Sequence, residues 1–299
     1  MNSIVKSFGG MVWLILIVSY SSCLSDIRSP MLKQGNPSEA NISKGKLLLD
    51  EVWKKQGFEH LKKHKVYEFE ATDNWQGMMG KMGKPWPDAK VDMSFKFEVG
   101  SFDGNVAFQS GKKKGHTAGL QSWNYYEKDN EGQPRKLKTN EKIRFGLSAY
   151  QYFIELADRL RSAPIITYAG SENMDGKKFE TVFVTWHKLQ AHRQNDQYKL
   201  YIDPSSYLLS YVVYTTRESY LKMPGGQLFY GSIKFDEYED VEGFLVPHRQ
   251  TVFLNAPKSD PSDFVHQMII SKFKFDSFEP SVLKPFPEVK ATGNSKSKG

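Results

Sequence analysis

The stretch Ala89-Lys-Val-Asp-Met-Ser-Phe-Lys-Phe-Glu-Val99 alternates apolar residues with charged or polar ones. Successive side chains of a β-strand point to opposite faces, so this alternation predicts a strand with one apolar face and one wet face. Such a pattern is typical of antiparallel sheets, because parallel sheets are usually covered on both sides. The apolar face would carry Val91, Met93, Phe95, Phe97 and Val99.

The rest of the chain repeats this strand chemistry at short intervals. Residues 65–71 alternate in the same way, and from Ile165 onward strand-like segments follow one another to Phe278 with almost no helical pattern between them. The connections contain turn signals, among them Asp175-Gly176 and Asp203-Pro204. This spacing predicts a mainly β (α+β) protein with a meandering antiparallel sheet that is large enough to curl.

Two segments have the period of amphipathic helices. Residues 45–61 carry apolar side chains three and four positions apart, with Ser43 as the predicted start and Gly57 as a break or kink. Ser148 is expected to cap a second helix that runs to about Arg161. A curved sheet has to fill its concave side, and these helices could cover it, leaving an apolar pocket where the cover is incomplete.

The segment from Trp75 to Trp86 interrupts this pattern with glycine, methionine and tryptophan. Its glycines and the prolines around Trp86 predict a loop rather than a regular strand. Two interpretations remain open: the loop packs its own apolar side chains onto the domain, or it is a mobile flap over a ligand.

The N-terminus has the features of a secretory signal that ends at the single cysteine, Cys23. Lys6 precedes the apolar run 11–18, which is too short to span a bilayer, and Ser21-Ser22 supply small residues before the cysteine. Cys23 is therefore predicted to be an acylated membrane anchor, although an ordinary secretory signal would leave this cysteine incidental. We expect a signal peptide over residues 1–22, a flexible tether over 23–42, one domain over 43–287 and a disordered tail over 288–299.

Composition and charge limit the classes of function. With Cys23 acylated, no thiol remains for a disulfide, a metal site or a nucleophile. The net charge of +7 could attract nucleic acid, yet an exported protein rarely meets it, and the lysines are dispersed, Lys112 to Lys114 being the longest run. We therefore expect no nucleic-acid partner.

The sequence contains no motif for a catalytic centre, a metal site or a cofactor site, so no catalytic residue, metal or cofactor is predicted. The spacing of His60 and His64 would suit a shared metal, but no acidic third ligand is adjacent. A hydrolase whose histidines and carboxylates come together only on folding remains an alternative. Its candidates are His116, His187, His192, His248 and the carboxylates between Asp236 and Glu242.

Three segments resemble the LolA/LolB-type lipoprotein-sorting family. They are Tyr168-Ala-Gly-Ser-Glu-Asn-Met-Asp-Gly-Lys-Lys-Phe179, Tyr198-Lys-Leu-Tyr-Ile-Asp-Pro-Ser-Ser-Tyr-Leu-Leu209 and Tyr238-Glu-Asp-Val-Glu-Gly-Phe-Leu-Val-Pro247, in the family's order and spacing. The resemblance covers roughly Ser43 to Phe278. It implies an unclosed antiparallel half-barrel with helices over the concave face, which holds acyl chains between sheet and helices. The Trp75 to Trp86 insertion and the predicted anchor depart from the soluble carriers of that family.

These observations predict a non-enzymatic lipoprotein of the bacterial cell envelope, facing the periplasm or the cell surface and bound to the membrane through Cys23. Its expected partner is a lipid or another apolar ligand, with a role in lipoprotein or lipid trafficking; its protein partners are unknown. Alternatives are the hydrolase above and a structural or assembly lipoprotein without a small ligand. The residues predicted to line the ligand are Met93, Phe95, Phe97, Phe153 and Leu156.

Overall fold

The structure is a computed structural model that describes residues 24–290 except 175, 221–227, 257–259 and 261. The predicted signal peptide, Cys23 and positions 291–299 of the predicted tail lie outside the described residues. In the described part of the chain, no helix is both long enough and apolar enough to cross a membrane.

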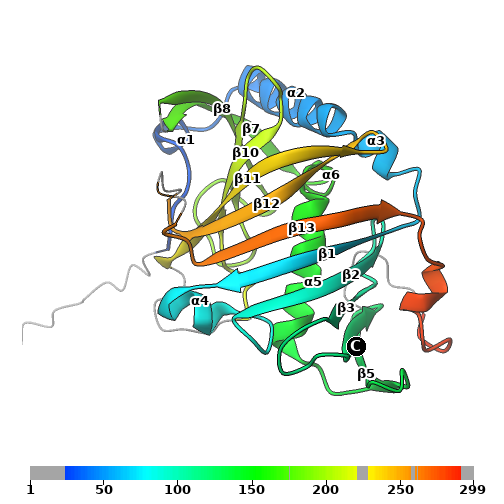
Figure 1. Cartoon of the computed structure of the whole chain (residues 1–299). Helices are drawn as coiled ribbons and strands as arrows, with labels where there is room; N and C mark the ends of the chain where they lie inside the picture. The colour runs from blue at the N-terminus through cyan, green and yellow to red at the C-terminus, as the bar shows by residue number, and fades with distance from the viewer. Residues whose placement is uncertain (1–23, 175, 221–227, 257–259, 261, 291–299) are drawn as a thin grey trace, which may run out of the picture.

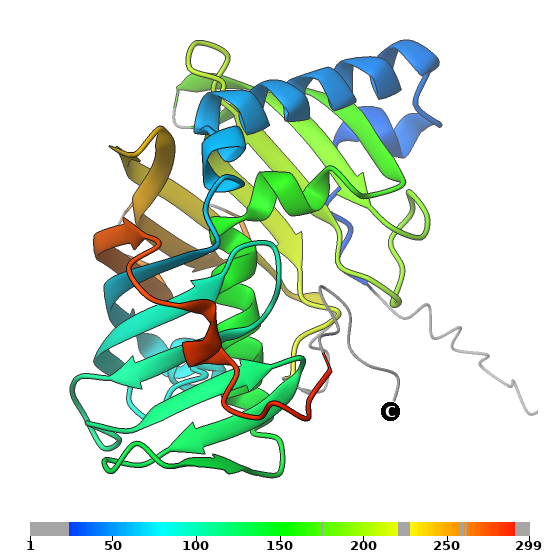
Figure 2. The ribbon, with the colours of Figure 1, turned by 90° about the vertical axis from the view of Figure 1, so that its right-hand side faces the viewer.

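One thirteen-stranded antiparallel sheet forms the body of the protein (Figure 1). Its strand order is β6-β5-β4-β3-β2-β1-β13-β12-β11-β10-β9-β8-β7, so the last strand pairs with the first, and β6 and β7 form the two edges. The sheet is therefore curved but not closed, as the sequence predicted (Figure 2). The strands are β1 Val66–Trp75, β2 Lys90–Glu98, β3 Gly104–Phe108, β4 Thr117–Gln121, β5 Asn124–Lys128, β6 Pro134–Lys136, β7 Ile165–Met174, β8 Lys177–Thr185, β9 Tyr198–Ile202, β10 Leu209–Thr215, β11 Tyr230–Val241, β12 Phe244–Leu254 and β13 His266–Phe275.

The alternation along β2 sets which face of the sheet is buried. Phe95 pairs with Phe69 of β1 and with Val106 of β3, and all three side chains are buried. The intervening Lys90 and Asp92 are exposed. The apolar face predicted from the sequence is thus the concave, helix-covered face.

Helix α5 crosses the concave face of the sheet (Figure 2). Together with α6 it connects β6 to β7, which are the two edges of the sheet, so the chain has to run across the open side. Helix α2 covers β7 and β8 near one edge. The helices are α1 Pro30–Gln34, α2 Glu39–Gln56, α3 Phe58–Leu61, α4 Gly77–Gly83, α5 Glu141–Ile154, α6 Leu156–Leu160 and the 3-10 helix η2 Pro280–Leu283.

The helices begin earlier than the sequence predicted. The hydroxyl of Ser38 accepts a hydrogen bond from the backbone N–H of Asn41 and starts α2 ahead of Ser43. None of the residues in this first turn, from Glu39 to Ile42, is buried, so the apolar period that reveals the helix starts later. The predicted break at Gly57 is confirmed, since this residue adopts the left-handed conformation (φ 85°) between α2 and α3.

The second predicted helix is two helices, and Ser148 does not cap it. The side chain of Asn140 accepts a hydrogen bond from the N–H of Ile143 and starts α5. Ser148 lies inside α5, where its hydroxyl donates to the carbonyls of Arg144 and Phe145. A serine in a helix interior often makes this bond to the preceding turn, so its presence alone does not mark a start.

The expected flexible tether is wrong for its first part, which packs against the convex face of the sheet. Ile27 and Leu32 are buried beside Phe183 of β8. Ser29 caps α1 and Pro30 occupies its first turn. The apolar residues that hold this segment, Ile27, Leu32 and the partly buried Met31, are few and irregularly spaced, so the sequence shows no period.

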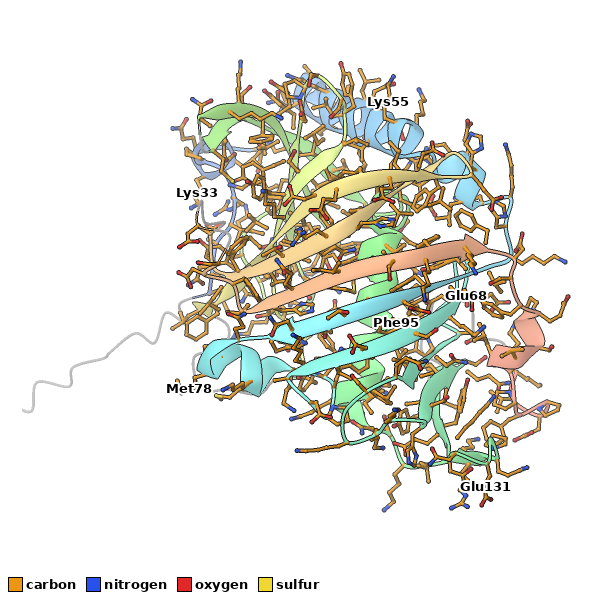
Figure 3. All side chains as sticks on the ribbon, in the orientation of Figure 1. Lys33, Lys55, Glu68, Met78, Phe95 and Glu131 are labelled. Carbon is orange, nitrogen blue, oxygen red and sulfur yellow. The ribbon has the colours of Figure 1, made fainter. Side chains whose placement is uncertain are left out.

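The Trp75 to Trp86 segment is packed and partly helical rather than a loop throughout. Strand β1 extends to Trp75, and α4 follows from Gly77. The Trp86 side chain is buried against Phe95 and Tyr150. Of the two interpretations, packing onto the domain is the one the structure shows for Trp86, whereas Met78 on α4 stays exposed at the rim of the molecule (Figure 3).

Candidate functional site: an apolar cavity with a polar wall

A cavity of about 210 Å³ lies between α4, the face of α5 that carries Phe145, Ala149 and Phe153, and one end of the sheet. The strand ends that meet there belong to β1, β10, β11, β12 and β13, which antiparallel pairing brings to the same end of the sheet. Most of the lining is aliphatic or aromatic. The residues include Trp75, Met79, Phe145, Ala149, Tyr150, Phe153, Asp196, Tyr214, Tyr220, Ile233, Gln250, Val252, His266 and Met268.

Aromatic contacts close one side of the cavity. The rings of Phe153 on α5 and Tyr214 on β10 lie 5.2 Å apart, as do those of Phe145 and Tyr220. The Tyr220 hydroxyl also donates to the carbonyl of Gly83, 2.7 Å away, and so connects this side to the end of α4. The cavity wall is therefore shared by segments that are far apart in sequence.

Glycine at position 80 lets α4 lie directly against the start of β13. A Cβ atom on Gly80 would lie 2.4 Å from the carbonyl oxygen of Val265, closer than atoms can approach. Gly80 and Val265 both line the cavity, so this contact fixes how closely α4 covers it.

Trp75, Tyr150 and His266 line one wall of the cavity and belong to a buried polar cluster centred on Asp73. Asp73, fully buried on β1, accepts hydrogen bonds from the Tyr150 hydroxyl (2.7 Å) and from the Trp75 indole N–H (2.6 Å), and its other oxygen contacts Nε2 of His266. The Tyr150 oxygen accepts in turn from the indole N–H of Trp86 at 3.1 Å. The Trp75 and His266 rings stack with their centroids 4.0 Å apart.

The hydrogen bonds define the protonation pattern of this cluster. The carboxylate of Asp73 accepts from every neighbour, so Nε2 of His266 carries its proton toward Asp73. Burial and the Asp73 charge raise the pKa of the Tyr150 hydroxyl well above its usual value, which keeps that group a donor. His266 and Asp73 are the groups of this cluster that can carry opposite charges, and their contact offsets the cost of burying the carboxylate.

This arrangement differs from a hydrolytic triad. In a triad, one nitrogen of the imidazole accepts the proton of a nucleophilic hydroxyl, and the other nitrogen donates to a separate carboxylate. Here the Tyr150 hydroxyl donates to Asp73 itself, and both contacts of the imidazole are made by Nε2. Among the described residues, Nδ1 of His266 has no hydrogen-bond partner. The cluster therefore fixes the His266 ring at the cavity wall rather than activating a hydroxyl.

A second carboxylic acid, Asp196, lines the cavity near β10. Its side chain accepts hydrogen bonds from the Thr215 hydroxyl and from the backbone N–H of Arg217. Burial, reinforced by the neighbouring charge of Glu218, raises the pKa of Asp196 from 3.8 to about 7. The group is therefore largely uncharged in mildly acidic solution.

Replacing Asp196 with asparagine should flatten the dependence of stability on pH. The raised pKa means that the folded state binds this proton more tightly than the unfolded state, so the contribution of Asp196 to stability is complete below about pH 4 and is lost as the pH rises through about 7. Asp196→Asn keeps the acceptor oxygen, and at pH 8 it should stabilise the protein by on the order of 2–3 kcal/mol, allowing for partial exposure. Urea unfolding at pH 5 and pH 8 measures the difference.

Asp203 offers a control of opposite sign. Its hydrogen bonds from Lys177 and Ser205 lower its pKa to about 2 against the effect of burial, so its contribution is present above pH 4 and is lost as the pH falls toward 2. Asp203→Asn should therefore destabilise the protein at pH 8. Equal responses of the two variants at pH 8 would contradict the assignment of Asp196.

A third buried carboxylate holds the far end of α5. Glu155 accepts hydrogen bonds from the hydroxyl of Tyr67 and from Gln151, and it forms an ion pair with Arg159 at 2.7 Å. Burial raises the pKa of Glu155 despite the nearby guanidinium. This cluster fixes the junction of α5 and α6 over the sheet, so we regard it as structural.

The structure separates the residues that were predicted to line a ligand. Phe153 lines the cavity, whereas Met93, Phe95, Phe97 and Leu156 are buried in the core and take no part in its wall. Strand β2, which alternates most clearly, therefore contributes to the hydrophobic core. The cavity lies farther along the sheet. Cys23 lies outside the described residues.

The structure brings some of the residues considered for a hydrolase together in pairs. The rings of His187 and His192 lie 5.4 Å apart, and His248 lies 3.6 Å from Glu239. His192 also contacts the Thr185 hydroxyl. Across the described residues, no group of three or more His, Cys, Asp or Glu side chains could hold a metal ion.

The polar wall of the cavity was not predicted from the sequence. Asp73, Gln250 and His266 lie on three strands, and β1 and β13, which carry two of them, stand at opposite ends of the chain. One signal was present: His266 begins a strand whose inward positions, Met268 and Ile270, are apolar. A histidine in such a row points inward, but the sequence alone does not give its partner.

Comparison with known proteins adds information on the fold. No protein-family model and no curated protein matches the chain. A solved structure of a DUF1329 family protein from Desulfovibrio piger is 14% identical, with a TM-score of 0.50 over 81% of this chain and 95% of that one.

Two further structures are similar at lower scores. A LolA superfamily protein from Nitrosomonas europaea is 11% identical over 80% of this chain and 96% of its own, with a TM-score of 0.46. A putative outer membrane lipoprotein-sorting protein domain from Vibrio parahaemolyticus is 11% identical over 81% and 97%, with a TM-score of 0.44. At such identities the likeness concerns the fold alone. The chain has a LolA/LolB-like fold, as the three quoted sequence segments predicted.

Proposed function

We propose that this protein is a non-enzymatic lipoprotein of the bacterial envelope that binds a lipid or another apolar ligand in the cavity between α5 and the sheet. The observation that carries the proposal is the cavity itself, which is lined mainly by aliphatic and aromatic side chains. In another protein, an apolar cavity of about 150 Å³ takes up benzene, so about 210 Å³ is enough for a short chain or for one end of a longer one. The hydrogen bonding of His266 supports binding over hydrolysis.

Filling the cavity should abolish binding. Ala149 on α5 lines the cavity, and a phenylalanine there would occupy much of its volume. We expect Ala149→Phe to weaken the binding of methyl octanoate at least tenfold, as measured by native mass spectrometry and by tryptophan fluorescence, because Trp75 lines the same space.

The matched control is Ala40→Phe. Ala40 is exposed on α2, so the same substitution there adds the ring without entering the cavity. Binding that is equal in both variants, or absent from the unmodified protein, would refute the proposed site.

The anchor is a separate part of the proposal. Replacing Cys23 with serine removes the thiol that would be acylated, so the protein should move from the membrane to the soluble envelope fraction. Mass spectrometry of the N-terminal peptide should show lipid on the unmodified protein. Unchanged partitioning of Cys23→Ser, with no lipid on the unmodified peptide, would contradict the anchor and leave the cavity unaffected.

A further inference from the structure

The chain is fixed to the domain only two residues after Cys23. The Arg217 guanidinium donates to the backbone carbonyl of Ser25 at 2.7 Å and to its hydroxyl oxygen at 3.0 Å. The Ser25 hydroxyl in turn donates to the carbonyl of Phe229, 3.3 Å away, and both Ser25 and Arg217 are buried. Ser25 is therefore held in one place on the domain.

This fixed position limits where an acylated Cys23 can lie. Two residues span at most about 7 Å, so the acyl chains on Cys23 would begin within that distance of Ser25. A flexible tether of about 20 residues, as the sequence predicted, would instead give a root-mean-square distance of about 25 Å. With so short a connection, the side of the domain around Ser25 has to lie against the lipid headgroups.

Apolar side chains are exposed on this same side. Seven large apolar side chains are exposed in the described part of the chain, and three of them are Leu228, Met78 and Met82. Leu228 precedes Phe229, whose carbonyl holds Ser25. Met78 and Met82 lie one turn apart on one face of α4, which borders the same cavity as Phe229. Helix α4 and the chain ahead of α1 lie on one side of the molecule, at the left of Figure 1.

Lysine side chains flank the two methionines. Helix α4 contains Lys81 and no acidic residue. Burial lowers the pKa of Lys84, which follows α4; the charge of Asp88 opposes this shift, and those of Lys142 and Lys112 add to it. Lys84 therefore lies among positive charges that outnumber the negative one. Apolar side chains next to lysines are typical of a surface that meets anionic lipid, because the ammonium groups stay at the phosphates while the apolar groups go deeper.

We infer that Met78 and Met82 on α4, together with Leu228, form a membrane-docking surface that rests on a bilayer containing anionic lipids. This inference rests on the predicted anchor of the proposed function and adds the orientation of the domain. The acyl chains supply the attachment, so the docking surface needs only a weak contact, made at a high effective concentration. The basic character is local to α4, since Asp260 and Asp263 lie in the loop before β13. The exposed apolar side chains and the short connection to Cys23 carry the inference.

Spin labels on the acylated full-length protein measure which side meets the lipid. Because Cys23 would be acylated, an introduced cysteine is the one free thiol, and Met78→Cys, Leu228→Cys, Lys55→Cys and Glu131→Cys can each carry a nitroxide. Lys55 and Glu131 are exposed and lie away from Met78 (Figure 3). In vesicles of phosphatidylethanolamine and phosphatidylglycerol, the labels at positions 78 and 228 should collide with an aqueous nickel chelate about threefold less often than those at 55 and 131, since an interfacial apolar face lies roughly 5–10 Å deep. The soluble Cys23→Ser form gives the value of each label in water.

Substitution of the second methionine tests the contact itself. With the label at position 78, Met82→Ser should raise the collision rate by about twofold, because it removes an apolar side chain that would be buried in the lipid. Leu47→Ser is the matched control and should change nothing, since Leu47 is 60% exposed on α2, away from α4 (Figure 1). If Met78→Cys does not fold, the label is placed on Met82→Cys and the substitution becomes Met78→Ser. Equal effects of the methionine substitution and of Leu47→Ser would overturn the docking surface.

The remaining outcomes separate this surface from the anchor. Equal collision rates at positions 78 and 55, in a protein whose N-terminal peptide carries lipid, would overturn the docking surface and leave the anchor standing. Protection of position 78 in the soluble Cys23→Ser form, without vesicles, would mean that a protein covers α4, which also overturns it. Absence of lipid from the N-terminal peptide would refute the anchor, and the inference would fall with it.

Discussion

Replacing Phe95 with alanine should lower the free energy of unfolding by about 3–5 kcal/mol, the usual range for removing a buried aromatic side chain. Phe95 is completely buried on β2, in the middle of the sheet (Figure 3). Its ring lies 5.1 Å from that of Phe69, 5.4 Å from that of Tyr150 and 5.7 Å from that of Trp86. Removal of the ring would leave a cavity that the strands on both sides cannot collapse to fill.

The loss should be the same with and without ligand, because Phe95 does not line the cavity. Chemical denaturation in the presence and absence of methyl octanoate measures both values. Phe278→Ala is the control: this ring is only half-buried, with the Lys96 ammonium 4.3 Å from its centre, and its loss should cost less than about 1.5 kcal/mol. A cost for Phe95→Ala as small as that of the control would mean that the core around β2 is not packed as described.

The position of Phe95 shows how far the sequence determines this fold. Apolar residues at every second position determine which face of β2 is buried. The same local pattern is informative for any strand in a sheet that is covered on one face only. The pairing of β1 with β13 is different, because it joins segments at opposite ends of the chain and leaves no local pattern. The shape of the sheet follows from that pairing.

The candidate site depends on such long-range pairing more than the core does. Phe153 lies on the apolar stripe of a helix, which is a local pattern, and it lines the cavity; its contact with a ligand stays a prediction. Asp73 was missed because the alternating segment was expected to end at Ala71, although Asp73 continues the inward row of Phe69 and Ala71. Gln250 was missed because a lone glutamine in a strand does not show which face it occupies. Buried polar groups are exceptions to the alternation from which strands are predicted, so sequence patterns tend to hide the residues that give a site its specificity.

Replacing His266 with phenylalanine should destabilise the protein by about 3–5 kcal/mol, the range observed when one partner of a buried ion pair is removed. Phenylalanine can keep the stacking on Trp75, so the change tests the Nε2 contact with Asp73 rather than the ring. Without that contact, Asp73 remains fully buried with the Tyr150 and Trp75 donors and no group that can carry a positive charge.

The double variant Asp73→Asn, His266→Phe should be more stable than His266→Phe alone. The introduced asparagine carries no charge, and its side-chain oxygen can still accept from the Trp75 indole N–H. The single changes are therefore expected to be strongly non-additive, with a coupling within the range of about 0.5–3 kcal/mol known for residues in contact. Urea unfolding of the four proteins at one pH gives this coupling directly. Additive effects would show that Asp73 and His266 act independently, and the contact between them would then not be what positions His266 at the cavity wall.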